Sequence, residues 1–335
     1  MDRRDFVKCA ATAAAAAAAL GVIGCNRGPQ DCPDLMRAEE HDTARDAPGY
    51  SKMGCNRHDP NLGGGKVAVA TGTDAAAMLT AAIAALDGVE QFVRKGDLVC
   101  IKPNLAWGQP PEVGANTSPQ VLAATIKMCR AAGAKEVLVL EHTMDSHAVS
   151  FGMSGAEQVC RDLGARLVNL NTQSMYREVQ LSQGMNLKSE AIAQDILDCD
   201  CYINIPCAKV HSATVVSVAL KNQMGAVWDR QRYHQGQSEN QQAGSLDQNI
   251  ADLATGLRPT LTIVDGTRAL MTGGPKGPGK IVKTNKLIVS ADMVAADAAA
   301  APLLGTKAHL VDHIRIAGDM GLGVADPAKL KLVHV

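Results

Sequence analysis

The chain has 335 residues, of which 46% are hydrophobic and 20% are charged. Its 33 basic and 34 acidic residues give a formal net charge of −1, so the overall charge gives no sign of the basic surface that nucleic-acid-binding proteins need. Aromatic residues make up 3% of the chain, so few rings could stack on single-stranded bases. We therefore expect no nucleic-acid partner.

The first residues have the layout of an export signal. Arg3 and Arg4 precede an uncharged, alanine-rich run from Cys9 to Gly24, which predicts a twin-arginine signal peptide over residues 1–24. A membrane-spanning helix needs roughly 20 strongly apolar residues, and this run is shorter and built of small residues. The alternative is an amphipathic or unstructured tail. The signal predicts a periplasmic or outer-surface protein, and the twin-arginine route carries proteins that are already folded.

The end of this run has a second interpretation. Cys25 follows Val22, Ile23 and Gly24, which resembles a lipoprotein signal whose cysteine is acylated and becomes the new N-terminus. The alternative keeps Cys25 as a thiol. If Cys25 is acylated, its lipid is the only membrane contact that we expect.

Residues 25–65 have the composition of a tether. They show no apolar periodicity, carry many charges and end in the glycine-rich segment 61–65, as flexible linkers do.

From Lys66 onward, short β-branched runs alternate with alanine-rich amphipathic stretches. This alternation is typical of repeated βαβ units. It predicts an α/β domain over residues 66–335, with a mostly parallel sheet and helices on both faces. We predict strands at 66–70, 98–102, 136–140, 166–170, 201–206, 260–265, 286–290 and 330–334. We predict helices near 74–87, 118–132, 154–164, 189–198, 211–224, 246–255 and 292–304, and a loop over 230–248.

Polar residues cluster after several of the predicted strands. In an open parallel sheet, ligands bind beyond the carboxyl ends of the strands, so these residues are the first candidates for a site. The candidates are Lys102, Asn104, Glu141, His142, Lys209, His211, Lys221, Asn222 and Asp265.

The three lysines of this set predict a site for a small anionic ligand. Lys102, Lys209 and Lys221 would attract a carboxylate or phosphate, and the Asn104 and Asn222 amides could hold it by hydrogen bonds. The alternative is that each lysine is a solvated loop charge or caps the end of a helix.

The acidic and imidazole side chains allow a second kind of site. Glu141, His142, His211 and Asp265 could hold a divalent metal or act as an acid and base pair. The alternative for each histidine is a structural hydrogen bond, with His211 or Ser212 capping a helix.

A glycine- and proline-rich segment covers residues 273–279. It lacks the Gly-Lys-Ser/Thr ending of a phosphate-binding loop, so we interpret it as a rigid turn. The sequence also contains no Gly-x-Ser-x-Gly or His-Glu-x-x-His motif, which argues against common hydrolases.

The chain contains ten cysteines, and three of them lie in the predicted tether. Because no core buries Cys25, Cys32 and Cys55 there, we predict an acyl anchor, a disulfide or a metal cluster. A 4Fe–4S cluster needs four thiolates, and Cys207 would supply the fourth, with Cys100 as the alternative. By contrast, residues 129 and 160 lie in predicted helices, where cysteine is a small core residue.

Several motifs occur in the order found in one known family. The chain is similar to the family called domain of unknown function 362 from about Lys66 to the C-terminus. The motifs are Ile101–Asn104, Pro110–Glu112, Ala115–Pro119, Lys209–Ser212, Lys221–Gly225 and Leu257–Leu261. The resemblance implies a twin-arginine signal and an association with iron–sulfur proteins. This chain lacks the paired Cys-x-x-Cys runs of members that carry ferredoxin modules.

These observations support three hypotheses. The first is an exported electron-transfer protein that holds a 4Fe–4S cluster through Cys25, Cys32, Cys55 and Cys207 and meets a redox partner protein. The second is an enzyme that binds a small carboxylate or phosphate at Lys102, Asn104, Lys209 and Lys221, with His211 or Glu141 as acid or base. The third is a non-catalytic binding or assembly protein in which Cys32 and Cys55 form a disulfide.

Overall fold

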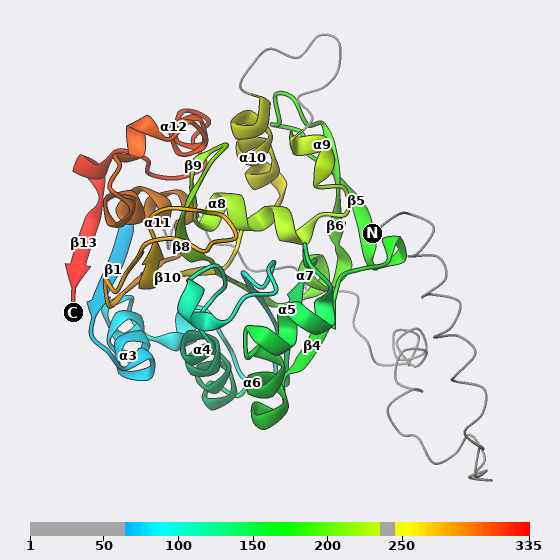
Figure 1. The fold of residues 1–335 in the computed structure, drawn as a ribbon, viewed down its shortest axis with the longest axis vertical. Helices are drawn as coiled ribbons and strands as arrows, with labels where there is room; N and C mark the ends of the chain where they lie inside the picture. Colours follow the sequence, from blue (N-terminus) through cyan, green and yellow to red (C-terminus); the bar gives the residue numbers. More distant parts are fainter. Residues whose placement is uncertain (1–63, 235–244) are drawn as a thin grey trace, which may run out of the picture. The chain divides into compact units, whose positions relative to one another are not determined.

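A computed structural model describes residues 64–234 and 245–335 of the chain. Figure 1 shows these residues as an α/β domain built around one large sheet. The predicted signal, most of the tether, and Cys25, Cys32 and Cys55 lie outside the described residues. Within those residues, no helix is both long and apolar enough to cross a lipid bilayer.

The large sheet has the strand order β13-β1-β12-β10-β7-β2-β3-β4. In that order the strands are Lys331–His334, Lys66–Thr71, Lys286–Ser290, Leu261–Leu270, Cys201–Ile205, Leu98–Pro103, Glu136–Glu141 and Arg166–Asn169. The five strands from β10 to β4 are all parallel, and β12 runs antiparallel to both its neighbours. The predicted α/β fold with a mostly parallel sheet is therefore confirmed.

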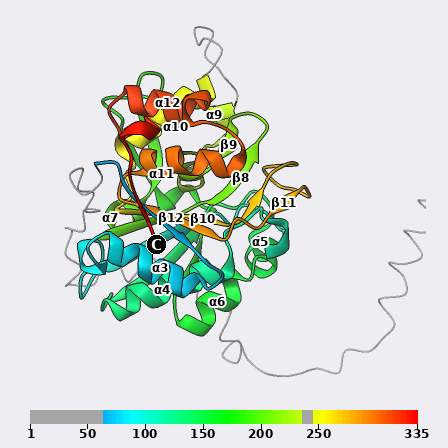
Figure 2. The same ribbon diagram turned by 90° about the vertical axis from the view of Figure 1, so that its left-hand side faces the viewer.

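Helices cover both faces of the sheet, as Figure 2 shows. One face carries α3 (Ala75–Ala85), α4 (Pro119–Ala131) and α6 (Ala156–Leu163). The other carries α8 (Ala219–Asn222), α10 (Ser245–Gly256), α11 (Met293–Ala300) and α12 (Asp312–Asp319). Alternate residues of β1 serve the two layers, since Val67 and Val69 pack in one core and Ala68 and Ala70 in the other.

The helices begin where the sequence offers side-chain caps. Asp74 accepts the N–H groups of Ala76 and Ala77 at the start of α3. The Ser118 side chain accepts the N–H of Val121 at the start of α4, and Pro119 at the first helical position has no N–H that needs an acceptor.

Two predicted helices are wrong. Residues 189–198 begin as strand β6 (Ser189–Ala193), which pairs with β5 (Tyr176–Gln180), and become helical only in α7 (Gln194–Asp198). Residues 211–224 begin at the end of β8 (Cys207–His211), continue as β9 (Val215–Ser217), and turn helical in α8. Four of the five residues 214–218 are β-branched and favour extended backbone, which explains the second error.

The predicted loop over 230–248 is also partly wrong. Helix α9 (Gln231–His234) opens this stretch, and α10 already begins at Ser245. The residues between them lie outside the described structure.

Strand β8 brings a new element to the carboxyl edge of the sheet. It follows β7 after a single residue, forms a hairpin with β9 and pairs with the second half of β10. The long strand β10 has a register shift between Asp265 and Leu270. Lys209 on β8 lies beside the end of β2, where its Nζ donates to Asn104 Oδ1.

Candidate functional site

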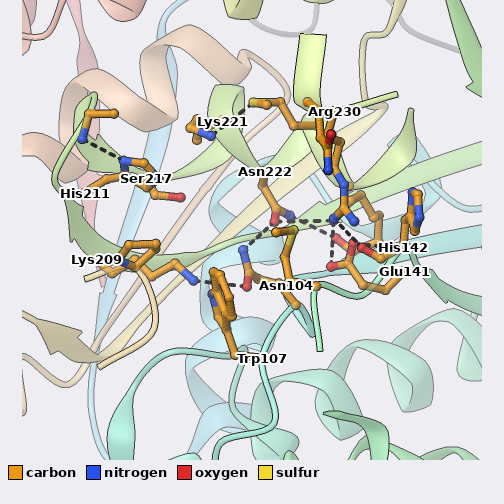
Figure 3. Close-up of a pocket in the computed structure, with 18 of the residues that line it drawn as sticks. Asn104, Trp107, Glu141, His142, Lys209, His211, Ser217, Lys221, Asn222 and Arg230 are labelled. Carbon is orange, nitrogen blue, oxygen red and sulfur yellow. Dashed lines mark hydrogen bonds and ion pairs between the residues drawn. The ribbon is translucent and has the colours of Figure 1, made fainter. Parts of the chain in front are cut away.

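A pocket of about 660 Å³ opens at the carboxyl ends of the central strands. Figure 3 shows side chains from β2, β3, β8, α8 and the segments that follow them converging on this space. The crevice lies where β3 and β7 leave β2 on opposite sides, the position at which doubly wound sheets bind ligands.

A buried ion pair forms the floor of the pocket. Lys102 Nζ lies 3.0 Å from Glu141 Oε2, and both side chains are 1% exposed. Glu141 also accepts the backbone N–H groups of Leu105 and His142. Burial lowers the pKa of Lys102, and the charge of Glu141 counters that effect. Because Glu141 is held by three donors, the pair is a fixed part of the site.

Two asparagines connect this pair to a second lysine. Asn104 Nδ2 donates to Asn222 Oδ1 at 2.9 Å, and Asn222 Nδ2 donates to Asn204 Oδ1 at 2.8 Å. Lys209 Nζ then donates to Asn104 Oδ1 at 3.1 Å and to the Ala115 carbonyl at 2.6 Å. The structure therefore joins residues separated by more than a hundred positions into one buried polar network.

Lys209 and Lys221 differ from Lys102 in their partners. Both are buried, and neither forms an ion pair with a carboxylate in the described part of the chain. Lys221 Nζ has Met224 Sδ at 3.1 Å as its hydrogen-bond acceptor, and thioether sulfur is a weak acceptor. Burial, together with the nearby charge of Lys209, lowers the pKa of Lys221 to about 8.

An arginine and two tryptophans complete the wall. Arg230 donates to the carbonyl groups of His142 and Thr143, and Trp228 stacks on the His142 ring with centroids 5.7 Å apart. Trp107 also lines the pocket, and its buried Nε1 has no hydrogen-bond partner within the described residues. Sequence reasoning missed these three residues, since Arg230 fell in a predicted loop and the tryptophans belong to no motif.

The two candidate histidines have different environments. His142 Nδ1 lies 3.1 Å from the Val227 carbonyl, and burial lowers the pKa of His142 with a further contribution from Arg230. His211 ends β8, and its Nδ1 lies 3.1 Å from the Ala213 N–H, which donates to it. A neutral His211 thus carries its proton on Nε2. The prediction that His211 or Ser212 caps a helix is wrong, because both lie in the β8–β9 hairpin.

Asp265 is not part of the pocket lining. It accepts the N–H of Ser118 at 2.7 Å and both donors of Thr267, so it fixes the start of α4 against β10. Within the described ranges, no group of three His, Cys, Asp or Glu side chains converges as metal ligands would. The suggested joint site of Asp265 with Glu141, His142 and His211 is not assembled there.

The described cysteines are buried and free. Cys207 Sγ donates to the Ala115 carbonyl at 3.3 Å, and burial raises the pKa of its thiol. Cys100 donates to the Asp195 carbonyl. Cys129 and Cys160 pack among the apolar residues of one core, as their helical positions predicted.

The glycine-rich segment 273–279 joins β10 to β11 (Ile281–Val282) and contributes Pro275 to the pocket wall. It packs closely on β8, because a Cβ at Gly274 would overlap the Val210 carbonyl. Lys276 of this segment pairs with Asp145 at 3.0 Å and lies 5.5 Å from the centre of the Trp107 ring. The predicted turn therefore borders the mouth of the site.

The fold and the site define a doubly wound α/β protein with a cation-rich pocket at the carboxyl edge of its sheet. Residues 99–302 match the family model described as domain of unknown function, DUF362. The chain belongs to this family.

Two individual proteins show similarity to the chain. A thylakoid-associated protein of Synechocystis is 26% identical over 212 residues, which cover 63% of this chain and 64% of that protein. The lactate racemase apoprotein of Thermoanaerobacterium thermosaccharolyticum has 11% identity and a TM-score of 0.39, over 67% of this chain and 54% of that one. The chain thus spans less than two thirds of the length of each.

Proposed function

We propose that the chain is an enzyme that binds a small carboxylate or phosphate ester in the pocket. The observation that carries this proposal is the pair of buried lysines, Lys209 and Lys221, that have no carboxylate partner among the described residues while facing an open cavity. Removing an ammonium group from water costs several kcal/mol unless a counter-charge offsets it. An anionic ligand would supply that counter-charge.

The charge of the lining supports the same proposal. The pocket lining has more basic than acidic side chains. The basic ones are Lys102, Lys209, Lys221 and Arg230, and the acidic ones are Glu141 and Asp229. Glu141 is already paired with Lys102. The remaining positive charge attracts anions, and the low-dielectric walls strengthen that attraction.

Chemistry at a bound anion requires an acid or base that can reach it. Glu141 is occupied by Lys102 and two backbone N–H groups, so it is poorly placed to accept a substrate proton. His211 lines the pocket and can donate from Nε2 when neutral. We assign the Nε2–H of His211 as a hydrogen-bond donor that stabilises negative charge on the substrate, and Asn104 and Asn222 as groups that orient the ligand.

Anion binding is tested by calorimetry and thermal shift with inorganic phosphate and small mono- and dicarboxylates. Lys209→Met removes one charge-assisted hydrogen bond, and we expect affinity to fall by about 1.5–3 kcal/mol, roughly ten- to a hundredfold. Affinity should also weaken as the pH rises through about 8, where Lys221 loses its charge.

The matched control is Lys127→Met, which removes an exposed lysine on α4 outside the pocket lining. It should bind anions as the parent protein does. Equal affinity of the Lys209→Met protein and the parent would refute the assignment of this pocket.

A second proposal concerns export and an iron–sulfur cluster. The paired Arg3 and Arg4 and the three cysteines of residues 25–65 support it, as does the family membership. Cys207 does not fit as the fourth ligand in the described conformation, because its thiol is buried and bonded to a carbonyl. Anaerobic purification followed by iron and sulfide analysis tests the cluster, and absence of both would exclude it.

A further inference from the structure

Lys221 has the surroundings of a reactive amine. Its side chain is 8% exposed and lines the pocket, and its Nζ has a methionine sulfur as acceptor where Lys102 and Lys209 have oxygens. Figure 3 shows it between the His211 and Arg230 sides of the cavity. The groups that act on it from neighbouring elements are Lys209, Arg230 and Asp247. Since two of these three are cations, a larger fraction of this amine is neutral near pH 7 than in a solvated lysine.

The short helix that carries Lys221 is fixed in place. Asp297 of α11 accepts the N–H groups of Ala219 and Leu220 at the start of α8. At the other end, Asn222 belongs to the buried network through Asn104 and Asn204. Lys221 therefore projects from a backbone held at both ends, which reduces the cost of placing its amine against a substrate.

We propose that Lys221 forms an imine with the carbonyl carbon of a small keto acid or phosphorylated aldehyde, whose anionic group is held by Lys209. This inference rests on the proposed function, because it needs the pocket to hold the anion. It names a substrate class that combines a carbonyl group with a carboxylate or phosphate.

The step needs one proton from solvent and no oxidant or reductant. The Nζ lone pair forms a bond to the carbonyl carbon, and the carbonyl π electrons move to oxygen, which takes the proton that Nζ releases. A proton from solvent then converts the hydroxyl group of this carbinolamine to water, which leaves as the carbon–oxygen bond breaks and the carbon–nitrogen double bond forms. The protonated imine withdraws electrons from the adjacent carbon, which promotes loss of a proton there.

The full chain is incubated separately with glyoxylate, pyruvate, 2-oxoglutarate and glyceraldehyde 3-phosphate in the presence of cyanoborohydride. Reduction converts an imine to a stable secondary amine, which peptide mass spectrometry locates. We expect an adduct on the peptide that contains Lys221 with at least one probe, and its rate should rise with pH up to about 8.

Three variants test whether the adduct depends on Lys221 and on the anion site. Lys221→Met should abolish the adduct, and Lys209→Met should reduce it roughly tenfold, because one charge-assisted bond to the anion is lost. The control Lys127→Met should react as the parent does. Circular dichroism spectra show whether each variant is folded, and thermal shift with phosphate shows whether its pocket still binds anions.

The outcomes separate the two proposals. Anion binding without an adduct on Lys221, or adducts spread evenly over exposed lysines, overturns the imine and leaves the anion site. Neither anion binding nor an adduct overturns both.

Discussion

Gly225 is the residue whose substitution tests the packing of the site most directly. A Cβ at this position would overlap Glu141 Oε1 and would lie 2.6 Å from Lys102 Nζ. Glycine is therefore needed for close approach of the backbone to the buried ion pair.

We expect Gly225→Ala to destabilise the protein by about 1–3 kcal/mol, the usual cost of overpacking, and to weaken anion binding by displacing Lys102. The control is Gly152→Ala in α5 (His147–Met153), where the nearest atom to the new Cβ lies 3.9 Å away. That change should be neutral or stabilising by about 0.5–1 kcal/mol. Urea unfolding measures both, and similar stabilities would contradict the prediction.

The sequence predicted the positions of individual site residues better than it predicted the short strands around them. Five candidates that follow predicted strands or close a predicted helix lie in one hydrogen-bonded network, namely Lys102, Asn104, Glu141, Lys209 and Asn222. Asp265 follows a strand as well, yet it points to the start of α4. The sequence predicts which edge a residue occupies, whereas the direction of its side chain depends on contacts with distant segments.

At the level of elements, the main prediction concerns the N-terminus of α8. Burial raises the pKa of Asp297 from 3.8 to about 6, so the folded protein binds more protons than the unfolded chain between these values. Stability should accordingly fall as the pH rises from about 4 to 6.

Asp297→Asn should remove most of this pH dependence, which amounts to roughly 2–3 kcal/mol at 1.36 kcal/mol per pKa unit. Asp162→Asn is the control, because Asp162 is exposed on α6. Chemical unfolding at a series of pH values gives, for each variant, the slope of the free energy of unfolding against pH. An unchanged slope in Asp297→Asn would assign the pH dependence to another group.

The elements that sequence reasoning missed share a physical cause. All eight predicted strands occur in the large sheet. The central parallel strands are the clearest of them, because buried parallel strands form continuous apolar runs. The predicted helix over 211–224 covers β9 and the turn before it, and no strand is predicted for β8, although the pairing of β8 with β10 brings Lys209 to the site. Short antiparallel strands depend on partners that no local pattern reveals.

At the level of the whole molecule, the edge of the sheet is formed by strands from both ends of the domain. Strand β13 pairs in parallel with β1, with Lys66 opposite Lys331. Without β13, the buried strand β1 would become an exposed edge.

We expect a chain that stops after Leu330 to lose about 2–4 kcal/mol of stability, given roughly 1 kcal/mol for each lost backbone hydrogen bond, and to aggregate more readily. Leu332→Thr is the control, since this half-exposed side chain can change without loss of those bonds. Urea unfolding and light scattering measure the two effects. A shortened chain as stable as the parent would show that β13 contributes little.

Because β12 lies between β1 and β10 in the sheet, β1 cannot form its native pairing until the C-terminal part of the domain has been translated. Lys286 Nζ bonds to Thr71 Oγ1 across 215 residues of sequence, so β1 leaves the ribosome long before either of its neighbours exists. During most of translation this apolar strand has no native partner, which makes the nascent chain prone to aggregation. We expect a holdase chaperone to bind the emerging N-terminal part of the domain until β12 has been made.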